Sequence, residues 1–546
     1  MKKLTHFILK ILILTILILC SYSYVERHAL VQRFQKWMHD TATEYLTPEE
    51  QKSGTGTLTD FMSLCRTRIS AVPLLQKYIN PADSSTSAWD HSVRTVAAAA
   101  ADSNTGSARQ DTTEPGTKTA GETSETEAAP ENNAAADQAA EKTRNLEYKA
   151  VWLSYLEFMD YLDSVEENTE ENFRDFFNHV ADRAKEAGMN RIIVQVRPFG
   201  DALYPSKYFP WSSCISGVQG RNPGYDPLKN MVDIAHKKGL AIEAWINPYR
   251  ILSTNDISIL APDNPALIWL KSKNRLARGR VLQYDGALYY NPSRASVRKL
   301  IKRGICEIIN NYQVDGIHMD DYFYPDFTEE NVFNSFDFKD YRKYSSTSSS
   351  AFWRYRNGKH NIFEWRRNNV SLLVSDIYRS IKAINPNITF GISPNGSLED
   401  LRSNYQHYAD VDRWVTEPGY VDYLMPQLYW GYSNEYSPYK ELLDQWADLM
   451  ADSTVKLYIG LPLYRMAAAD SESPDAYEFE HADLFHKMLR DINRKDIIKG
   501  ITLFSYEYLD VDNKKFLFYS TEYSEDQKKI LRDVFQIIKK FSRDTG

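Results

Sequence analysis

The chain has 546 residues, of which 43% are hydrophobic and 25% charged, and its formal net charge is −8. This composition is typical of a globular protein with a sizeable core. The acidic balance provides no basic surface for phosphate backbones, so we expect no nucleic-acid partner. Aromatic side chains are numerous, with 36 Tyr, 24 Phe and 11 Trp, and they fit either a large core or a sugar-binding surface.

The first 24 residues have the pattern of a targeting segment. Basic Lys2 and Lys3 precede an apolar run at residues 11–19, which is shorter than the ~20 residues that span a bilayer comfortably. We therefore expect a signal peptide or membrane anchor and an extracytoplasmic protein, either secreted or attached to the membrane through its N-terminus. Cleavage, retention and lipidation at Cys20 all remain open.

Two further segments precede the main domain. Residues 25–80 contain patchy amphipathic stretches that predict one or two short helices of unknown role. Residues 81–147 are rich in Ala, Thr, Ser, Glu and Asp and nearly lack large apolar side chains. Such a segment buries too little surface to offset its ordering entropy, so we expect a low-complexity, disordered linker.

From residue 148 to 546, short apolar runs alternate with helical patterns, which predicts parallel βαβ units. Eight runs over about 400 residues favour a (β/α)₈ TIM barrel with long inserted βα loops. A doubly wound sheet is the alternative, but the first run is followed by SYLEFMDYL rather than a Gly-rich phosphate loop. The expected strands are 149–155, 190–198, 240–248, 314–323, 388–396, 420–430, 456–464 and 499–509.

The two longest inserts follow the third and fourth expected strands, at about 251–290 and 325–365. Both fall on the barrel face where enzymes of this architecture build their sites.

Side-chain alternation along the strands predicts which residues point into the barrel. In the fourth strand, apolar Ile317 and Met319 share one face, so His318 and Asp320 share the inward face near the C-terminal rim. Polar side chains converging from several strand ends are typical of a catalytic mouth. The other inward residues predicted in this way are Gln195, Arg197, Trp245, Asn247, Ser393, Asn395, Gln427, Tyr429, Tyr464, Ser505 and Glu507.

Such a ring suits cleavage of a glycosidic bond, which generally needs one carboxylic acid and one carboxylate. Asp320 and Asp321 lie together at a strand end, but adjacent residues on a regular strand point apart. The second carboxylate could therefore also be Glu507 or Glu243. For Glu243, a structural ion pair, with Arg197 for example, is an equally good interpretation.

A family resemblance extends from residue 148 to about 465. The stretches QVRPFGDALYPSKYFPWS, GYDPL, AHKKGLAIEAWINPYR, NPSRASVRKLI, VDGIHMDDYFYP, GISPNG and VDYLMPQLYWGY resemble a bacterial glycosyl-hydrolase-like family related to glycoside hydrolase family 10, formerly a domain of unknown function. The resemblance implies a TIM barrel, an extracytoplasmic bacterial setting and hydrolysis of a glycan, with cell-wall glycan as one candidate. It points to Asp320 and Asp321 as the reactive pair.

Alternation and resemblance together give the predicted site. The catalytic candidates are Asp320, Asp321 and Glu507. The predicted substrate-binding residues are Gln195, Arg197, Asp201, Asn247, Tyr249, Arg250, His318, Tyr322, Asn395, Gln427, Tyr429 and Trp430.

Structural roles compete with these assignments. Asp315 and Asp422 stand where strands begin, so we interpret both as structural rather than catalytic. Asp201 and Arg250 could form loop-bracing ion pairs as readily as substrate contacts. Trp430 could stack on a sugar or pack in the core.

The leading hypothesis is an exported bacterial glycoside hydrolase that acts on a polysaccharide, needs no cofactor and is a monomer. The alternative is a non-catalytic carbohydrate-binding or cell-envelope scaffold protein on a degenerate barrel. A third hypothesis is a metal-dependent hydrolase using His318, although no HxH or HExxH spacing supports a metal. His318 is better explained as a hydrogen-bond partner of Asp320 or of a sugar hydroxyl.

Overall fold

The structure, a computed structural model, describes residues 146–329, 331–333, 336–347, 362–466, 473–512 and 523–544. The expected targeting segment, the short helical region and almost all of the expected linker lie outside these ranges. Within the described ranges, no helix is long and apolar enough to cross a membrane.

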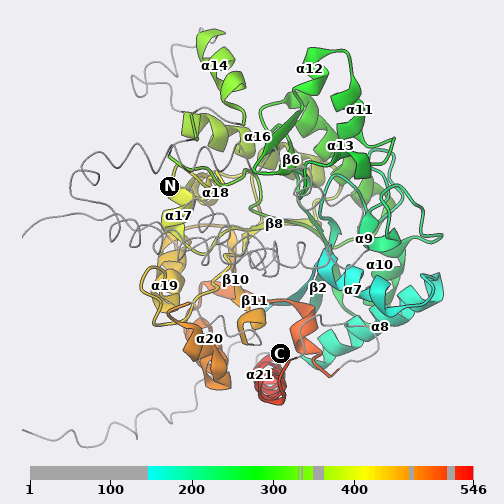
Figure 1. Ribbon diagram of the computed structural model, residues 1–546. Helices are drawn as coiled ribbons and strands as arrows, with labels where there is room; N and C mark the ends of the chain where they lie inside the picture. The colour runs from blue at the N-terminus through cyan, green and yellow to red at the C-terminus, as the bar shows by residue number, and fades with distance from the viewer. Residues whose placement is uncertain are drawn as a thin grey trace, which may run out of the picture. The chain divides into compact units, whose positions relative to one another are not determined.

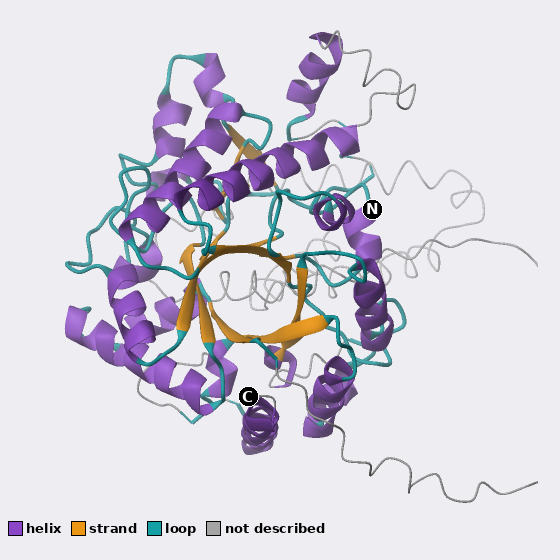
Figure 2. Ribbon diagram, turned by 180° about the vertical axis from the view of Figure 1, so that it is seen from behind, coloured by secondary structure: helices purple, strands orange, loops and turns teal. Residues whose placement is uncertain are grey.

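Eight parallel strands close into a barrel, which confirms the predicted (β/α)₈ architecture (Figure 2). The first strand pairs with the last, Tyr148 beside Gly500 and Val151 beside Leu503, so the sheet has no open edge. This closure excludes the doubly wound alternative. In their order around the barrel, the strands are β1 (Tyr148–Leu153), β11 (Ile498–Phe504), β10 (Lys456–Pro462), β9 (Tyr423–Leu424), β8 (Thr389–Ser393), β7 (Gly316–Asp320), β3 (Ala241–Ile246) and β2 (Arg191–Arg197).

Helices follow every strand and surround the barrel (Figures 1 and 2). Helix α8 begins at Glu170 and is capped by Thr169, whose side chain accepts from the Asn172 N–H, and its apolar residues recur at helical spacing on the buried face. The longer helices are α7 (Tyr155–Ser164), α8 (Glu170–Glu186), α10 (Pro227–Lys237), α13 (Ala295–Asn311), α14 (Phe338–Thr347), α16 (Ile362–Ile384), α19 (Tyr439–Leu449), α20 (Ala482–Asn493) and α21 (Glu525–Asp544). The shorter ones are α9 (Ser213–Ser216), α11 (Pro265–Lys271), α12 (Arg275–Arg278), α17 (Leu398–Arg402) and α18 (Val411–Thr416).

All eight barrel strands are shorter than the ranges expected from the sequence, and the ends of three of them bear on the site. The sixth barrel strand, β9, is only two residues long, because Pro426 has no N–H to donate to a ladder. The fourth, β7, ends at Asp320, and the chain then turns. The eighth, β11, ends at Phe504 and is followed by a 3₁₀ turn, η4 (Tyr506–Leu509).

The first insert is a small subdomain attached after β3. Its three antiparallel strands are β4 (Arg250–Leu252), β6 (Ala287–Tyr290) and β5 (Val281–Tyr284), in that order, and α11 and α12 complete it (Figure 1). Its last strand leads into α13, so the insert is tied at both ends to the β3–α13 unit.

The N-terminal end of the barrel is filled by side chains. Tyr148 and Tyr458 stack with ring centres 4.0 Å apart, and Tyr423 fills the space beside Gly391. The Glu243 carboxylate, fully buried, accepts from Arg191 at 3.0 Å and from the Tyr423 hydroxyl at 2.5 Å. Because side chains fill this end of the barrel, a ligand site is expected at the C-terminal end.

Candidate active site

Asp320 is the last residue of β7, and its side chain points into the C-terminal mouth of the barrel. Its Oδ2 accepts hydrogen bonds from Trp245 Nε1 at 3.1 Å and Asn247 Nδ2 at 2.8 Å. Its Oδ1 accepts only a long bond, 3.3 Å, from the Tyr322 N–H. The carboxyl is therefore fixed through one oxygen, while the other is the better place for a proton.

The environment of Asp320 favours its protonated form. Only 3% of the residue is exposed. Burial, and then the charge of neighbouring Asp321, raise the pKa of Asp320 to about 7, although Arg250 and the hydrogen-bond donors oppose this rise. Near neutral pH this carboxyl can therefore hold a proton and give it up, as a general acid must.

Asp321 reaches the same mouth because β7 ends one residue earlier. Its Oδ2 accepts the Asn395 N–H at 2.6 Å and lies 3.3 Å from Nδ1 of His407. It too is 3% exposed. A backbone N–H and a histidine ring both stabilise the ionised form of a carboxylate, so the two adjacent aspartates have opposite surroundings.

A series of buried hydrogen bonds ends at Asp320 and fixes the orientation of its side chain. The Tyr155 N–H donates to Gln195 Oε1 at 3.0 Å, Gln195 Nε2 donates to Asn247 Oδ1 at 2.7 Å, and Asn247 donates to Asp320. These bonds connect the start of α7 with β2, the end of β3 and β7. Gln195 and Asn247 were predicted to bind substrate, but they are 2% and 0% exposed, so they orient Asp320 instead.

Half-exposed rings and one guanidinium surround the carboxylates. The rings of Tyr429, Tyr464 and Phe504 pack together with centres 5.7 to 6.0 Å apart. The Arg250 guanidinium carbon lies 5.1 Å from the ring centre of Tyr322. All five side chains are partly exposed. Flat apolar faces of this kind suit the faces of sugar rings.

Other predicted residues support the mouth from β8 and β9. Gln427 Nε2 donates to the Ser393 carbonyl at 2.8 Å, and Asn395 forms a parallel bridge with Gln427. Asn395 contributes its backbone N–H to Asp321, while its side chain accepts from Ser397 N at 2.7 Å. Trp430 is half-exposed and packs over Gly396.

Arg197 does not point into the barrel, contrary to the alternation argument. The pairing of β2 with β3 skips Val196, so this bulge turns the next side chain to the outer face. Arg197 is fully buried there, with its guanidinium carbon 3.6 Å above the Phe209 ring and near Gly304 of α13. It belongs to the packing between barrel and helix.

His318 points inward as predicted, but it lies below the mouth and does not contact Asp320. Its Nε2 bonds with Trp152 Nε1 at 3.2 Å and Ser393 Oγ at 3.0 Å, and its Nδ1 with the Tyr423 hydroxyl at 2.9 Å. Burial lowers the pKa of His318 to about 3. The ring is therefore neutral, with both nitrogens engaged, and it offers no contact to a metal or sugar. Across the described residues, no group of three or more His, Cys, Asp or Glu side chains is arranged to hold a metal ion.

The other two carboxylate candidates stand apart from the aspartate pair. Glu243 pairs with Arg191 rather than Arg197, at the packed end of the barrel. Glu507 lies in η4, beyond the strand end, and its Oε1 accepts a long bond of 3.5 Å from the Tyr523 hydroxyl. The alternation argument placed it inward because it extended the strand past Phe504.

Two predicted contacts are instead buried supports. Asp201 is 1% exposed and its Oδ2 accepts from Gln219 Nε2 at 3.0 Å, so it braces the loop after β2. Tyr249 is fully buried, with its ring edge toward Phe323. The other oxygen of Asp201 and the Tyr249 hydroxyl are buried without a hydrogen-bond partner.

Two residues near the mouth escaped prediction. His407 lies in the loop after β8, where no strand period indicates direction. Glu157 follows β1 and is fully buried, and its Oε2 accepts from Ser154 N at 2.9 Å. The Ser154-x-x-Glu157 capping box in the sequence indicates that Glu157 lies at the start of a helix directly after β1.

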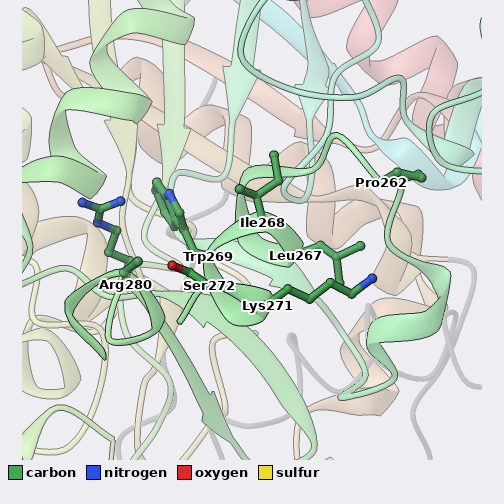
Figure 3. A pocket seen from close by; sticks show the side chains of 8 residues that line it. Pro262, Leu267, Ile268, Trp269, Lys271, Ser272 and Arg280 are labelled. Carbon is green, nitrogen blue, oxygen red and sulfur yellow. The ribbon is translucent and has the colours of Figure 1, made fainter. Parts of the chain in front are cut away.

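A separate hollow of about 590 Å³ lies on the first insert (Figure 3). Trp269 and Arg280 stand at one side of it, and the lining contains no carboxylate. It shares no residue with the aspartate pair, and we assign it no role in the chemistry.

Comparison with known proteins places these observations in a family context. A family model described as glycosyl hydrolase-like 10 matches residues 147–478. Glycosyl hydrolase YngK of Bacillus subtilis (strain 168) is 36% identical over 334 residues, covering 59% of this chain and 61% of that protein. Glycosyl hydrolase DigH of Escherichia coli (strain K12) is 32% identical over 347 residues, covering 60% of this chain and 74% of that protein. The chain thus spans less than two thirds of the length of the Bacillus relative.

Among solved structures, the glycoside hydrolase domain of PgaB (BpsB) from Bordetella bronchiseptica covers 68% of this chain and 96% of its own, with a TM-score of 0.45 and 10% identity.

Proposed function

Because this chain belongs to the glycosyl hydrolase-like 10 family, we propose that it is a glycoside hydrolase in which Asp320 and Asp321 carry the reaction. The observation that supports this most is the contrast between the two buried aspartates at the end of β7. One has its pKa raised to about 7, and the other accepts a backbone N–H and faces a histidine.

The reaction uses this contrast. Asp320, protonated, gives its proton to the glycosidic oxygen as the bond to the anomeric carbon breaks. The Asp321 carboxylate stabilises the oxocarbenium-like transition state and either attacks the anomeric carbon or removes a proton from the attacking water. The net change is addition of one water across the bond. No cofactor enters any of these steps.

The substrate class follows from the rim. Partly exposed Tyr322, Tyr429, Tyr464 and Phe504 offer flat faces around the acids, and Arg250 offers a donor to hydroxyl groups. We propose a polysaccharide substrate, with bacterial cell-wall glycan tested first. The N-terminal sequence pattern supports a site of action outside the cytoplasm, in a secreted or membrane-attached form.

Product analysis tests this function. The wild-type protein is incubated with peptidoglycan strands and with plant and microbial polysaccharides, and the products are identified by mass spectrometry. We expect shorter oligosaccharides whose masses include one added water per cleavage, and undiminished activity in the presence of EDTA. Glycan binding without any product after long incubation would instead favour the carbohydrate-binding scaffold. Loss of cleavage in EDTA would favour the metal-dependent hydrolase.

A further inference from the structure

We propose that His407 is a positioning residue that keeps Asp321 ionised and aimed at the reacting sugar, and that a buried arginine–aspartate pair holds His407 in place. This proposal rests on the proposed function of the aspartate pair. His407 lies in the loop after β8 and is not part of any barrel strand.

The contact between the two residues is direct. His407 Nδ1 lies 3.3 Å from Asp321 Oδ2, with side-chain exposures of 13% and 5%. The Asn395 N–H approaches the same oxygen at 2.6 Å. Asp321 is therefore held from two sides, by the loop after β8 in both cases, and its other oxygen remains for chemistry.

The charge around His407 favours the protonated ring. Burial opposes that charge, but Asp321, Asp326 and Asp400 outweigh it, so the pKa of His407 is raised. Without the ring's positive charge, three carboxylates and the adjacent Asp320 would face one another. The other titratable groups that sense Asp321 are the phenols of Tyr322 and Tyr429.

The backbone conformation of His407 is unfavourable by itself and is stabilised by contacts with other parts of the chain. His407 and Tyr408 have φ of 51° and 57°, in the left-handed region that non-glycine residues rarely adopt, at a cost on the order of 1 kcal/mol or more each. The Tyr408 hydroxyl accepts from Arg366 Nη1 at 2.9 Å and donates to the Asn404 carbonyl at 2.6 Å. These bonds fix the turn that presents the imidazole.

Arg366, on α16, ties this turn to the loop that follows Asp321. Its Nη2 and Nε lie 2.7 and 3.0 Å from Asp337 Oδ1, and the Tyr324 hydroxyl donates to Asp337 Oδ2 at 2.9 Å. Arg366 is fully buried and Asp337 nearly so. One guanidinium thus links the loops after β7 and β8, which bring Asp321 and His407 together.

The pH dependence of kcat/KM separates this role from a merely structural one. In His407→Asn, the amide retains a donor near the position of Nδ1 but loses the charge. An opposite charge at this range lowers the pKa of a carboxylate by about one unit or more. Without that charge, we expect the acidic limb of the kcat/KM profile, where activity falls at low pH, to move up by about one pH unit. kcat/KM should then fall about tenfold below the limb and change little above it. Tyr408→Phe, which loosens the turn, should move the limb in the same direction by less.

The matched control is His236→Gln. His236 Nε2 lies 3.0 Å from Asp315 Oδ2. This histidine–aspartate pair is similar in distance but more exposed, and it lies away from the aspartate site, so its loss should leave the limb in place. An equal loss of activity at every pH in His407→Asn, or an unmoved limb, would overturn the proposal.

An NMR titration decides the coupling without substrate. The His407 ring signal, assigned among the 11 histidines by its absence in His407→Asn, is followed against pH in the wild-type protein and in Asp321→Asn. We expect the midpoint to fall by about one unit in Asp321→Asn, and an unchanged midpoint would overturn the proposal. Absence of glycan cleavage by the wild-type protein would sink the proposed function, and this titration would still report on the contact.

Discussion

The acid strength of Asp320 is set by a few identifiable atoms. Burial and the neighbouring Asp321 charge raise its pKa to about 7, whereas the donors on Oδ2 pull it down. As the pH rises through this value the acid loses its proton, so kcat/KM should have an alkaline limb near pH 7.

The Asn247→Ala variant tests this assignment. It removes the 2.8 Å bond to Asp320 Oδ2, and a hydrogen bond to a charged group contributes about 1.5 to 3 kcal/mol. The ionised form loses that support, so the alkaline limb should move up by about one to two pH units. A pH profile of kcat/KM measures the shift. A limb that stays in place or moves down would contradict the assignment of Asp320 as the acid.

The same burial predicts a stability gain in Asp320→Asn. The folded-state pKa is raised above the unfolded value, so the contribution of Asp320 to stability is fully present below pH 3.8 and is lost as the pH rises through about 7. The variant should therefore be more stable than the wild type at pH 8, by about 4 kcal/mol at most, and the advantage should shrink at pH 4. Urea unfolding at both pH values measures this. A variant that is less stable at pH 8 would show that the carboxylate is a structural group.

At the scale of single elements, regular strands were predictable and their ends were not. Alternation correctly predicted that His318 and Asp320 share the inner face of β7, because the strand keeps its pleat as far as Asp320. Alternation failed for Arg197, because a bulge in β2 turns this side chain to the outer face of the barrel, and for Glu507, which lies past the end of β11. His407 lies in a loop, and its place depends on tertiary contacts that a local pattern does not contain.

The pairing of β8 with β9 depends on a glycine that sequence alone did not explain. A Cβ on Gly391 would lie 2.0 Å from ring atoms of Tyr423. Gly391→Ala should therefore destabilise the protein by about 1 to 3 kcal/mol, since overpacking a filled layer moves side chains and backbone. Thermal or urea unfolding measures the loss. The control is Gly279→Ala, where the nearest atom is Nη2 at the far end of the long Arg294 side chain, 3.1 Å away, and equal effects in the two variants would count against the packed layer.

At the scale of the whole molecule, the order of elements along the chain was the most informative feature of the sequence. Eight apolar runs with helices between them predicted the barrel, and each of the eight runs overlaps a barrel strand. The family match ends at residue 478, but β11 at residues 498–504 is needed to close the sheet onto β1. The barrel therefore extends beyond the matched region.

Truncation tests where the folded barrel unit begins and ends. A chain starting at Asn145 contains every described element, so it should keep its unfolding midpoint and its kcat/KM on a soluble oligosaccharide. A chain that stops at Asp496 lacks β11 and leaves β1 and β10 as open edges, so it should not fold cooperatively. Circular dichroism melts and activity assays of both chains measure this. Failure of the first chain to fold would show that the preceding residues belong to the barrel unit.

The most direct measurement is kcat/KM on a cleavable glycan for Asp320→Asn and Asp321→Asn, beside Asp315→Asn as a control at the opposite end of the same strand. General acid–base groups contribute about 10²- to 10⁴-fold, so each site variant should lose at least a hundredfold while keeping its fold, and the control should stay within a few-fold of the wild type. Wild-type activity in a folded Asp320→Asn variant would contradict the central claim that these two aspartates carry out the hydrolysis.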